Sequence, residues 1–305
     1  MNAIAPGIYP TMITPYDDAG RVDMDAVRRI VEWYVAHGVD GIFAVCQSSE
    51  MFFLSEDERA ALAEAVVRAA AGRVCVVVSG HVSDKTEDQI RELKRIEASG
   101  AAALVLVSNR LAAEGEDDGV LLANMNRILE AIPDATFGMY ECPYPYKRLL
   151  TPRVLEAMAE SGRFAFIKDT CCDADVIASR VKLLAGRVGL FNANSATLLD
   201  TLKSGAAGFS GIMANFHPEL YAWLFRNYRA EPERAKTLSA FLSLASGIER
   251  GLYPTSAKYH MNRAGVPMTL RCRNQKEEAF TPLLRREIDD LIALEAHFMA
   301  EYIRV

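Results

Sequence analysis

Eight short runs rich in β-branched and aromatic residues recur along this chain, and stretches with helical periodicity separate them. Strands that alternate with helices pair in parallel, because each helix carries the chain back to the end of the sheet where the strand began. Eight such units predict an α/β fold, the (β/α)8 TIM barrel, which a chain of 305 residues can form as one unit. The predicted strands are 7–13, 41–45, 74–79, 103–107, 136–140, 164–168, 188–192 and 207–211.

The helical stretches carry start signals as well as periodicity. Segments 23–37, 56–71 and 85–99 have the 3.6-residue apolar repeat of helices that cover a sheet. Three helix starts are predicted from capping patterns, in which side-chain oxygens satisfy the free terminal amides. These starts are Ser55 with Glu58, Asp84 with Glu87, and Thr151 before Pro152.

The pattern changes after Gly211, where helices follow one another with no strand between them. The predicted helices are 216–228, 232–249, 254–264 and 282–302. We therefore predict a barrel over residues 1–229 and a C-terminal helical extension over residues 230–305. The extension would pack against the barrel, make oligomer contacts or cover the rim of a site.

Composition narrows the class of protein. The net charge is −6 with no basic cluster, which argues against a nucleic-acid partner and leaves small anionic metabolites open. No signal peptide or membrane-spanning stretch is expected. The six cysteines lack metal-ligand spacing, and vicinal Cys171 and Cys172 are expected to be free thiols rather than a redox pair. A reduced, cytoplasmic enzyme is predicted.

Lys168 ends the apolar run 164–168. Burial disfavours an ammonium group, and the neutral amine that results can attack a ketone to form a Schiff base. The other lysines are predicted to lie in loops or on helices where they reach water. The alternative is that Lys168 extends out of the strand to a surface carboxylate such as Asp169.

Active sites of such barrels lie at the carboxyl ends of the strands. Tyr140 ends the strand before that of Lys168, at the same level, where a phenol can shuttle protons for a carbinolamine. Ser48 would orient the phenol or bind a carboxylate, and the amides of 47–49 form an anion site.

Three further residues near the strand ends have alternative roles. His81 is expected to be a hydrogen-bonded residue of the barrel rim rather than a proton carrier. Glu141 would bind substrate hydroxyls or be a solvated loop carboxylate. Cys142 is expected to pack rather than act as a pocket thiol.

Five motifs occur in an order and spacing that extend over nearly the whole chain. They are Thr14-Pro15, Cys46-Gln47-Ser48-Ser49-Glu50, Tyr140 with Pro143, Ile167-Lys168-Asp169, and Gly208-Phe209-Ser210-Gly211 followed by Ala214-Asn215. Together they resemble the dihydrodipicolinate synthase/N-acetylneuraminate lyase family of Schiff-base-forming barrels, as a divergent member.

The resemblance implies a 2-oxo acid, pyruvate or a derivative, held as a Schiff base on Lys168, with Tyr140 as acid and base. Ser48 would hold the carboxylate, and the implied substrate-binding residues are Gln47, Ser49, Asn194 and Ser210. No metal or organic cofactor is needed, because the iminium is itself the electron sink. Family members are usually homotetramers built as dimers of dimers.

The residues that set specificity in the family differ here. Dihydrodipicolinate synthases carry a tyrosine after strand 4, where this chain has Val107-Ser108-Asn109. They also carry an arginine where this chain has Pro145, with Lys147 and Arg148 nearby. Neuraminate lyases carry acidic residues after strand 7, where this chain has Asn194-Ser195. Gln47 replaces a small hydroxyl residue and changes the shape of the carboxylate pocket.

The leading prediction is a pyruvate-type aldolase, a lyase that makes or breaks a carbon–carbon bond of a 2-oxo acid. The alternatives, in order, are a Schiff-base dehydratase of a sugar-derived 2-oxo acid, dihydrodipicolinate synthase itself, and a non-catalytic protein that binds an oxo acid. The altered Gln47 and Ser49 motivate the last of these.

Overall fold

The computed structural model describes residues 4–303, in which eight parallel strands form one sheet. Neighbouring strands follow the order β1-β8-β7-β6-β5-β4-β3-β2. The ring closes between the segment after β1 and strand β2, where Thr11 pairs with Phe43 and the Met12 N–H donates to the Phe43 carbonyl at 2.9 Å. The predicted (β/α)8 barrel is confirmed. The strands are β1 (Gly7–Ile8), β2 (Gly41–Ala44), β3 (Cys75–Val78), β4 (Ala103–Val107), β5 (Phe137–Tyr140), β6 (Phe164–Asp169), β7 (Gly189–Asn192) and β8 (Gly208–Phe209).

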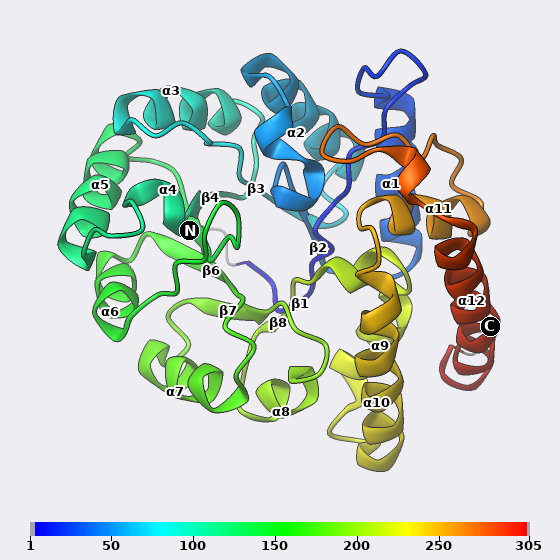
Figure 1. Ribbon diagram of the computed structural model, residues 1–305. Helices are drawn as coiled ribbons and strands as arrows, with labels where there is room; N and C mark the ends of the chain where they lie inside the picture. The colour runs from blue at the N-terminus through cyan, green and yellow to red at the C-terminus, as the bar shows by residue number, and fades with distance from the viewer. Residues whose placement is uncertain (1–3, 304–305) are drawn as a thin grey trace.

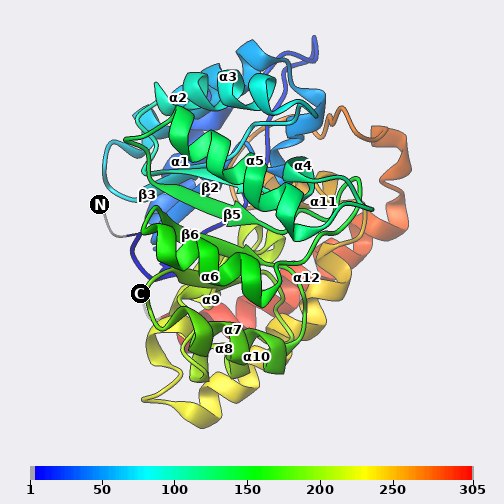
Figure 2. The ribbon, with the colours of Figure 1, turned by 90° about the vertical axis from the view of Figure 1, so that its left-hand side faces the viewer.

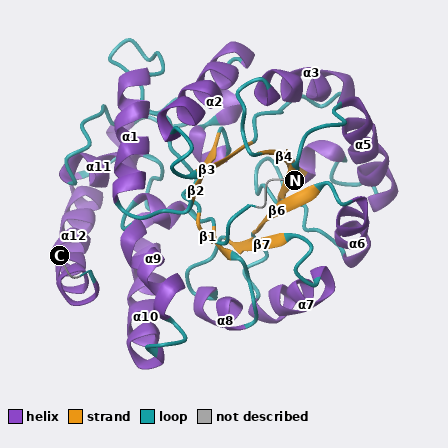
Figure 3. Ribbon diagram, turned by 180° about the vertical axis from the view of Figure 1, so that it is seen from behind, coloured by secondary structure: helices purple, strands orange, loops and turns teal. Residues whose placement is uncertain are grey.

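Helices surround the strands, as Figures 1 and 3 show from the two ends of the barrel. In the side view of Figure 2, α5 and α6 lie outside β5 and β6. The α-helices are α1 (Met24–Ala36), α2 (Glu56–Ala70), α3 (Thr86–Glu97), α4 (Ser108–Leu111), α5 (Asp118–Ala131), α6 (Pro152–Ser161), α7 (Ala174–Leu184), α8 (Leu198–Lys203), α9 (Pro218–Asn227), α10 (Pro232–Glu249), α11 (Thr255–Arg263) and α12 (Pro282–Tyr302).

The first and last strands are shorter than predicted. β1 ends at Ile8 instead of residue 13, because Pro10 has no N–H to donate to a ladder and the chain leaves regular pairing there. The Pro10 carbonyl still accepts the Phe43 N–H at 2.9 Å. The strand register of the barrel is therefore preserved although the strand itself is interrupted.

Two of the three predicted helix starts are confirmed. Ser55 accepts from the Glu58 N–H while Glu58 accepts from the Ser55 N–H, and Thr151 caps α6 ahead of Pro152. The prediction for Asp84 is wrong, because α3 begins one residue later than the pattern requires, after Lys85. Asp84 instead pairs with Arg110 at 2.9 Å.

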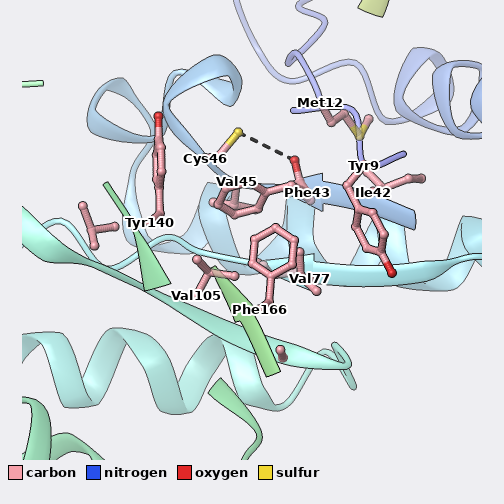
Figure 4. Close-up of a cluster of buried hydrophobic side chains, with 14 of the residues drawn as sticks. Tyr9, Met12, Ile42, Phe43, Val45, Cys46, Val77, Val105, Tyr140 and Phe166 are labelled. Carbon is pink, nitrogen blue, oxygen red and sulfur yellow. Dashed lines mark hydrogen bonds between the residues drawn. The ribbon is translucent and has the colours of Figure 1, made fainter. Parts of the chain in front are cut away.

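Aromatic side chains fill the barrel interior beneath its mouth. Tyr9, Phe43, Phe166 and Phe191 are fully buried, and neighbouring ring centroids lie 4.6 to 5.8 Å apart. Figure 4 shows Phe43 and Phe166 together, with Tyr140 beside them at the edge of the cluster. Side chains two residues apart share one face of a strand, so Lys168 points to the same side as Phe166.

Helices α10, α11 and α12 form the predicted C-terminal extension, which lies beside α1 and α9 on one flank of the barrel (Figure 1). Apolar residues that include Leu238, Phe241 and Leu291 pack it against α9. The proposed division at residues 229 and 230 falls in the connection between α9 and α10 and stays a prediction. Within residues 4–303, no helix combines the length and the apolar character needed to cross a bilayer.

Candidate active site

Lys168 lies at the carboxyl end of β6 and is only 3% exposed. Its Nζ stands 4.5 Å from the centroid of the Tyr140 ring and 5.6 Å from that of Phe43. Burial lowers the pKa of Lys168 to about 8, and the nearby Cys46 and Cys142 oppose that shift. A lysine with this pKa has a neutral, nucleophilic fraction near neutral pH.

Asp169 does not partner Lys168, so the alternative of a lysine extending to a surface carboxylate is wrong. Asp169 is fully buried and binds Arg180 and the Cys171 N–H instead. Glu141 lies in the same network and contacts Arg180 at 2.8 Å.

Glu141 is neither of the two things predicted for it. It is fully buried, and its carboxylate accepts the N–H groups of Leu150 and Thr170, both at 2.8 Å. Burial, with the adjacent Asp169, raises the pKa of Glu141 to about 7 despite the Arg180 charge. This carboxylate braces the loops after β5 and β6 and does not line the cavity described below.

Tyr140 lies opposite Lys168 in the β5–β6 register, so the predicted neighbourhood of these two residues is confirmed. Its hydroxyl donates to Gln47 Oε1 at 3.3 Å, and the Cys142 thiol reaches the same oxygen at 3.4 Å. Figure 4 shows the hydroxyl directed away from the Phe166 ring. Burial raises the pKa of Tyr140 well above its usual value, which keeps the phenol protonated.

The turn 47–49 follows β2 at the barrel mouth. Ser48 donates to the Thr11 hydroxyl at 3.0 Å and lines the cavity. Ser49 is buried, donates to the Met12 carbonyl at 2.6 Å and accepts from the Cys46 N–H at 3.1 Å. The turn is entered through Val45 at φ +50°, a conformation that a β-branched residue rarely adopts. Ser49 therefore stabilises the turn by these hydrogen bonds, whereas Ser48 lines the cavity.

Of the two other predicted substrate-binding residues, one lines the cavity and one does not. Asn194 lines the cavity, and its Oδ1 accepts the Thr197 N–H at 3.1 Å. Ser210 is fully buried outside that lining, and its hydroxyl has no hydrogen-bond partner within residues 4–303.

A cavity of about 560 Å³ opens over Lys168. Its barrel residues are Gln47, Ser48, Tyr140, Pro143, Lys147, Lys168, Thr170, Cys172, Ala193, Asn194, Ala196, Ile212 and Met213. The extension contributes Ser243, Ser246, Arg250, Tyr253, Pro254 and Asn274. Covering the rim of the site was one of the three roles considered for it. Arg250 and Tyr253 could not be predicted to lie here, because no local pattern shows which residues of an added helical segment reach a barrel mouth.

The prediction that all other lysines reach water is wrong for Lys258. It is fully buried in α11, with Nζ 4.7 Å from the centroid of the Tyr16 ring and 3.8 Å from Glu50 Oε2. The amine also donates to the Arg271 carbonyl. Burial lowers the pKa of Lys258, while Glu50 and Cys272 oppose that shift.

His81 is hydrogen-bonded, as expected, and it is fully buried. Its Nε2 accepts the Val107 N–H at 2.7 Å, and burial lowers its pKa to about 3, so the ring stays neutral. Cys171 and Cys172 are free thiols, as predicted.

The chain matches the family model of the dihydrodipicolinate synthetase family over residues 5–284. A 4-hydroxy-tetrahydrodipicolinate synthase from Ruegeria pomeroyi is 29% identical over 299 residues, which cover 95% of this chain and 96% of the relative. An enzyme of the same name from Clostridium perfringens is 24% identical and covers 96% of this chain and 97% of its own.

Solved structures share the fold at lower identity. A prophage protein of E. coli K12 from the dihydrodipicolinic acid synthase family, in complex with pyruvate, has a TM-score of 0.86 at 19% identity, covering 96% of this chain and 99% of its own. A Clostridium difficile protein in complex with mannosamine has a TM-score of 0.85 at 18% identity, covering 95% and 98%. From the match to the family model across most of its length, the chain belongs to the dihydrodipicolinate synthetase family, a family of lyases.

Proposed function

We propose that this protein is a lyase that cleaves or forms a carbon–carbon bond of a 2-oxo acid through a Schiff base on Lys168. The observation that carries the proposal is the environment of Nζ. The amine is buried against the Tyr140 and Phe43 rings, opens onto the 560 Å³ cavity and has a pKa lowered to about 8. The relative solved with pyruvate supports a 2-oxo acid as the ligand.

In the proposed reaction, the neutral Lys168 amine attacks the C2 ketone to form a carbinolamine. Tyr140 gives its proton to the carbinolamine hydroxyl, which leaves as water, and an iminium remains. The C3–C4 bond then breaks, its electron pair moves to the iminium to form an enamine, and the phenolate takes the proton of the C4 hydroxyl. The C4 fragment leaves as an aldehyde, and Tyr140 returns its proton to C3 of the enamine. Water then hydrolyses the iminium, which releases pyruvate and restores the amine, and the proton set free returns to the phenolate.

Local contacts support the roles of the residues beside the amine. Gln47 Oε1 accepts from the Tyr140 hydroxyl and so directs the phenol, and Ser48 with the amides of its turn is the proposed carboxylate site. We propose that Asn194 binds substrate hydroxyls from the cavity wall. Ser49 and Ser210 lie behind this wall, so their proposed contribution is through the position of the backbone.

The charge of the cavity favours a substrate with a second acidic group. Besides Lys168, whose amine is used for the Schiff base, its lining holds two cationic side chains, Lys147 and Arg250, and no carboxylate among the residues that the structure describes. Lys147 donates to the Thr170 carbonyl at 2.8 Å and Arg250 to the Ser246 carbonyl at 3.0 Å, which leaves further N–H groups of both for an anion. We propose that the part of the substrate beyond C4 carries a carboxylate.

The loop after β4 argues against the condensation made by the named relatives. Asn109 donates to the Cys142 and Tyr144 carbonyls at 2.8 and 2.9 Å, and Ser108 donates to the Arg148 carbonyl at 2.8 Å. Both side chains brace loops where dihydrodipicolinate synthases are expected to place a tyrosine. The cytoplasmic location and the homotetramer predicted from the sequence stay predictions.

The test is product analysis with a panel of sugar-derived 2-oxo acids, half of them with a terminal carboxylate. Release of pyruvate, read with lactate dehydrogenase, supports the lyase, whereas a product that has only lost water identifies the dehydratase. Good turnover of pyruvate with aspartate semialdehyde would instead identify a dihydrodipicolinate synthase. Oxo-acid binding without turnover across the panel would mark a non-catalytic protein.

A pair of variants tests the substrate's charge. Arg250→Gln should raise KM for the substrate with a terminal carboxylate and leave KM for its neutral counterpart unchanged. The matched control is Arg153→Gln, because Arg153 is exposed on α6 and does not line the cavity. Equal effects of Arg250→Gln on both substrates would remove the charge argument.

A further inference from the structure

Two histidines and two glutamates form a buried cluster where the last barrel helix meets the C-terminal extension. His217 precedes α9, Glu249 ends α10, His260 lies in α11 and Glu295 lies in α12. Their exposed fractions are 0%, 0%, 3% and 7%. None of them lines the cavity over Lys168, and the proposed lyase chemistry does not use them.

Three of these side chains bring one possible ligand atom each to within 4.8 Å of one another, namely His217, His260 and Glu295. Glu295 Oε2 lies 3.6 Å from His217 Nδ1 and 2.8 Å from His260 Nε2. Around a tetrahedral ion with bonds of about 2.0–2.1 Å, neighbouring ligand atoms are roughly 3.3 Å apart. The two measured distances fall on either side of that value, so a small adjustment of side chains would accommodate an ion.

Glu249 contacts the other nitrogen of the His217 ring, Nε2. Its Oε1 lies 2.8 Å from His217 Nε2, and a carboxylate there favours the tautomer with the proton on Nε2 and a free lone pair on Nδ1. The contact is short but poorly directed, and neither ring nitrogen of His217 has a hydrogen bond within residues 4–303. Both carboxylates lie near the ring, but an ion at Nδ1 would give this buried nitrogen the directed bond that the Glu295 contact at 3.6 Å does not.

The cluster has access from the surface. A cavity of about 330 Å³ is lined by His260 and Glu295, together with Arg263, Ala264, Ile292, Ala296 and Met299. It provides a path for an ion and room for water as the fourth ligand. Three protein ligands with an open fourth position is a coordination that zinc sites in proteins use.

We propose that His217 Nδ1, His260 Nε2 and the Glu295 carboxylate bind one divalent first-row transition ion, with Zn²⁺ as the reference ion. Imidazole nitrogen with a single carboxylate suits such ions, whereas Mg²⁺ and Ca²⁺ require mostly oxygen ligands. Two neutral imidazoles, the carboxylates of Glu249 and Glu295, and a doubly charged ion also sum to zero charge, which suits a buried site. The ion would join α9, α11 and α12.

The test uses the full-length protein, stripped of metal with a chelator and titrated calorimetrically with ZnCl2. We expect one Zn²⁺ per chain and a melting temperature that rises with zinc but not with MgCl2. His260→Gln should lose this binding, and Glu249→Gln should weaken it about 10–100-fold. His297→Gln is the matched control, because His297 is exposed on α12 and should bind zinc as the wild type does.

Wild-type protein that takes up no Zn²⁺, or a His260→Gln variant that binds it unchanged, would overturn the proposal. If His260→Gln does not fold, the spectrum of the Co²⁺-loaded wild type decides. Tetrahedral d–d bands without a thiolate charge-transfer band support the histidine site. A thiolate charge-transfer band would assign the metal to cysteine and overturn the proposal.

Discussion

The two buried lysines of this protein occupy similar surroundings but face different groups. Lys168 and Lys258 are 3% and 0% exposed, each lies over a tyrosine ring at 4.5 and 4.7 Å, and burial lowers the pKa of both. Lys258 donates to a backbone carbonyl beside the Glu50 carboxylate, whereas Lys168 opens onto the 560 Å³ cavity. Burial makes a lysine costly in both regions, and the groups facing the amine decide whether it serves structure or chemistry.

The structural lysine belongs to a bridge between the barrel mouth and the extension. Glu50, at φ +58° after the turn 47–49, accepts the N–H groups of Arg273 and Asn274 at 2.6 and 2.9 Å. Lys258 lies at 3.8 Å on the other carboxylate oxygen. This arrangement ties the 271–274 segment to the turn that carries Ser48, and it encloses the amine, since Lys258 is fully buried.

The largest contrast is expected from replacing each lysine by arginine. Lys168→Arg should reduce turnover below detection, because a guanidinium with a pKa above about 12 cannot supply a neutral nucleophile. Lys258→Arg should keep turnover, since the charge faces Glu50 and not the cavity. Steady-state kinetics on both variants check this, and an active Lys168→Arg enzyme would contradict the assignment.

Tyr140→Phe should separate the ring from the hydroxyl. The phenylalanine keeps the aromatic face under Nζ but removes the proton donor, so kcat should fall about 10²–10⁴-fold. Schiff-base formation on Lys168 should persist at a reduced rate. The matched control is Tyr146→Phe, because Tyr146 donates to the Asn109 and Ala112 carbonyls away from the cavity lining. Equal losses in the two variants would argue against a proton-transfer role.

Removing the two charges should affect stability differently. Lys258→Met leaves the buried Glu50 carboxylate without its cation and should lower the free energy of unfolding by about 3 kcal/mol. This is the lower end of the range for breaking a buried ion pair, because Glu50 keeps its two backbone N–H partners. Lys168→Met removes a buried ammonium that faces no carboxylate in its network, so stability should be unchanged or higher. Urea unfolding at neutral pH measures the free energy of unfolding of both variants. Equal losses in the two would contradict the different roles assigned to Lys168 and Lys258.

The pH dependence gives the smallest expected effect. With a Lys168 pKa of about 8, the neutral fraction rises about tenfold per pH unit below that value and levels off above it. The rate of iminium formation should therefore increase from pH 6 to 8 and flatten by pH 9. Single-turnover trapping measures this rate. An increase that continues to about pH 10 would indicate a lysine with an ordinary pKa.

The sequence predicts most of the barrel because strand–helix alternation is a local pattern with one common spatial solution. The neighbourhood of Lys168 and Tyr140 follows from the same rule, since both residues end adjacent parallel strands. Contacts between distant segments could not be predicted this way. Arg180 binds Glu141 from 39 residues away, and Glu50 meets Arg273 from 223 residues away. The burial of Lys258 could not be predicted either, because a helix of mixed polarity does not reveal which of its polar residues faces a partner inside the protein.

The most direct test of the account is reductive trapping. The protein is incubated with pyruvate and reduced with borohydride, and peptide mass spectrometry locates the added mass, with Lys258→Arg as the control protein. We expect a pyruvate-sized adduct on Lys168 in both proteins. An adduct on Lys258 or another lysine, with Lys168 unmodified, would contradict it.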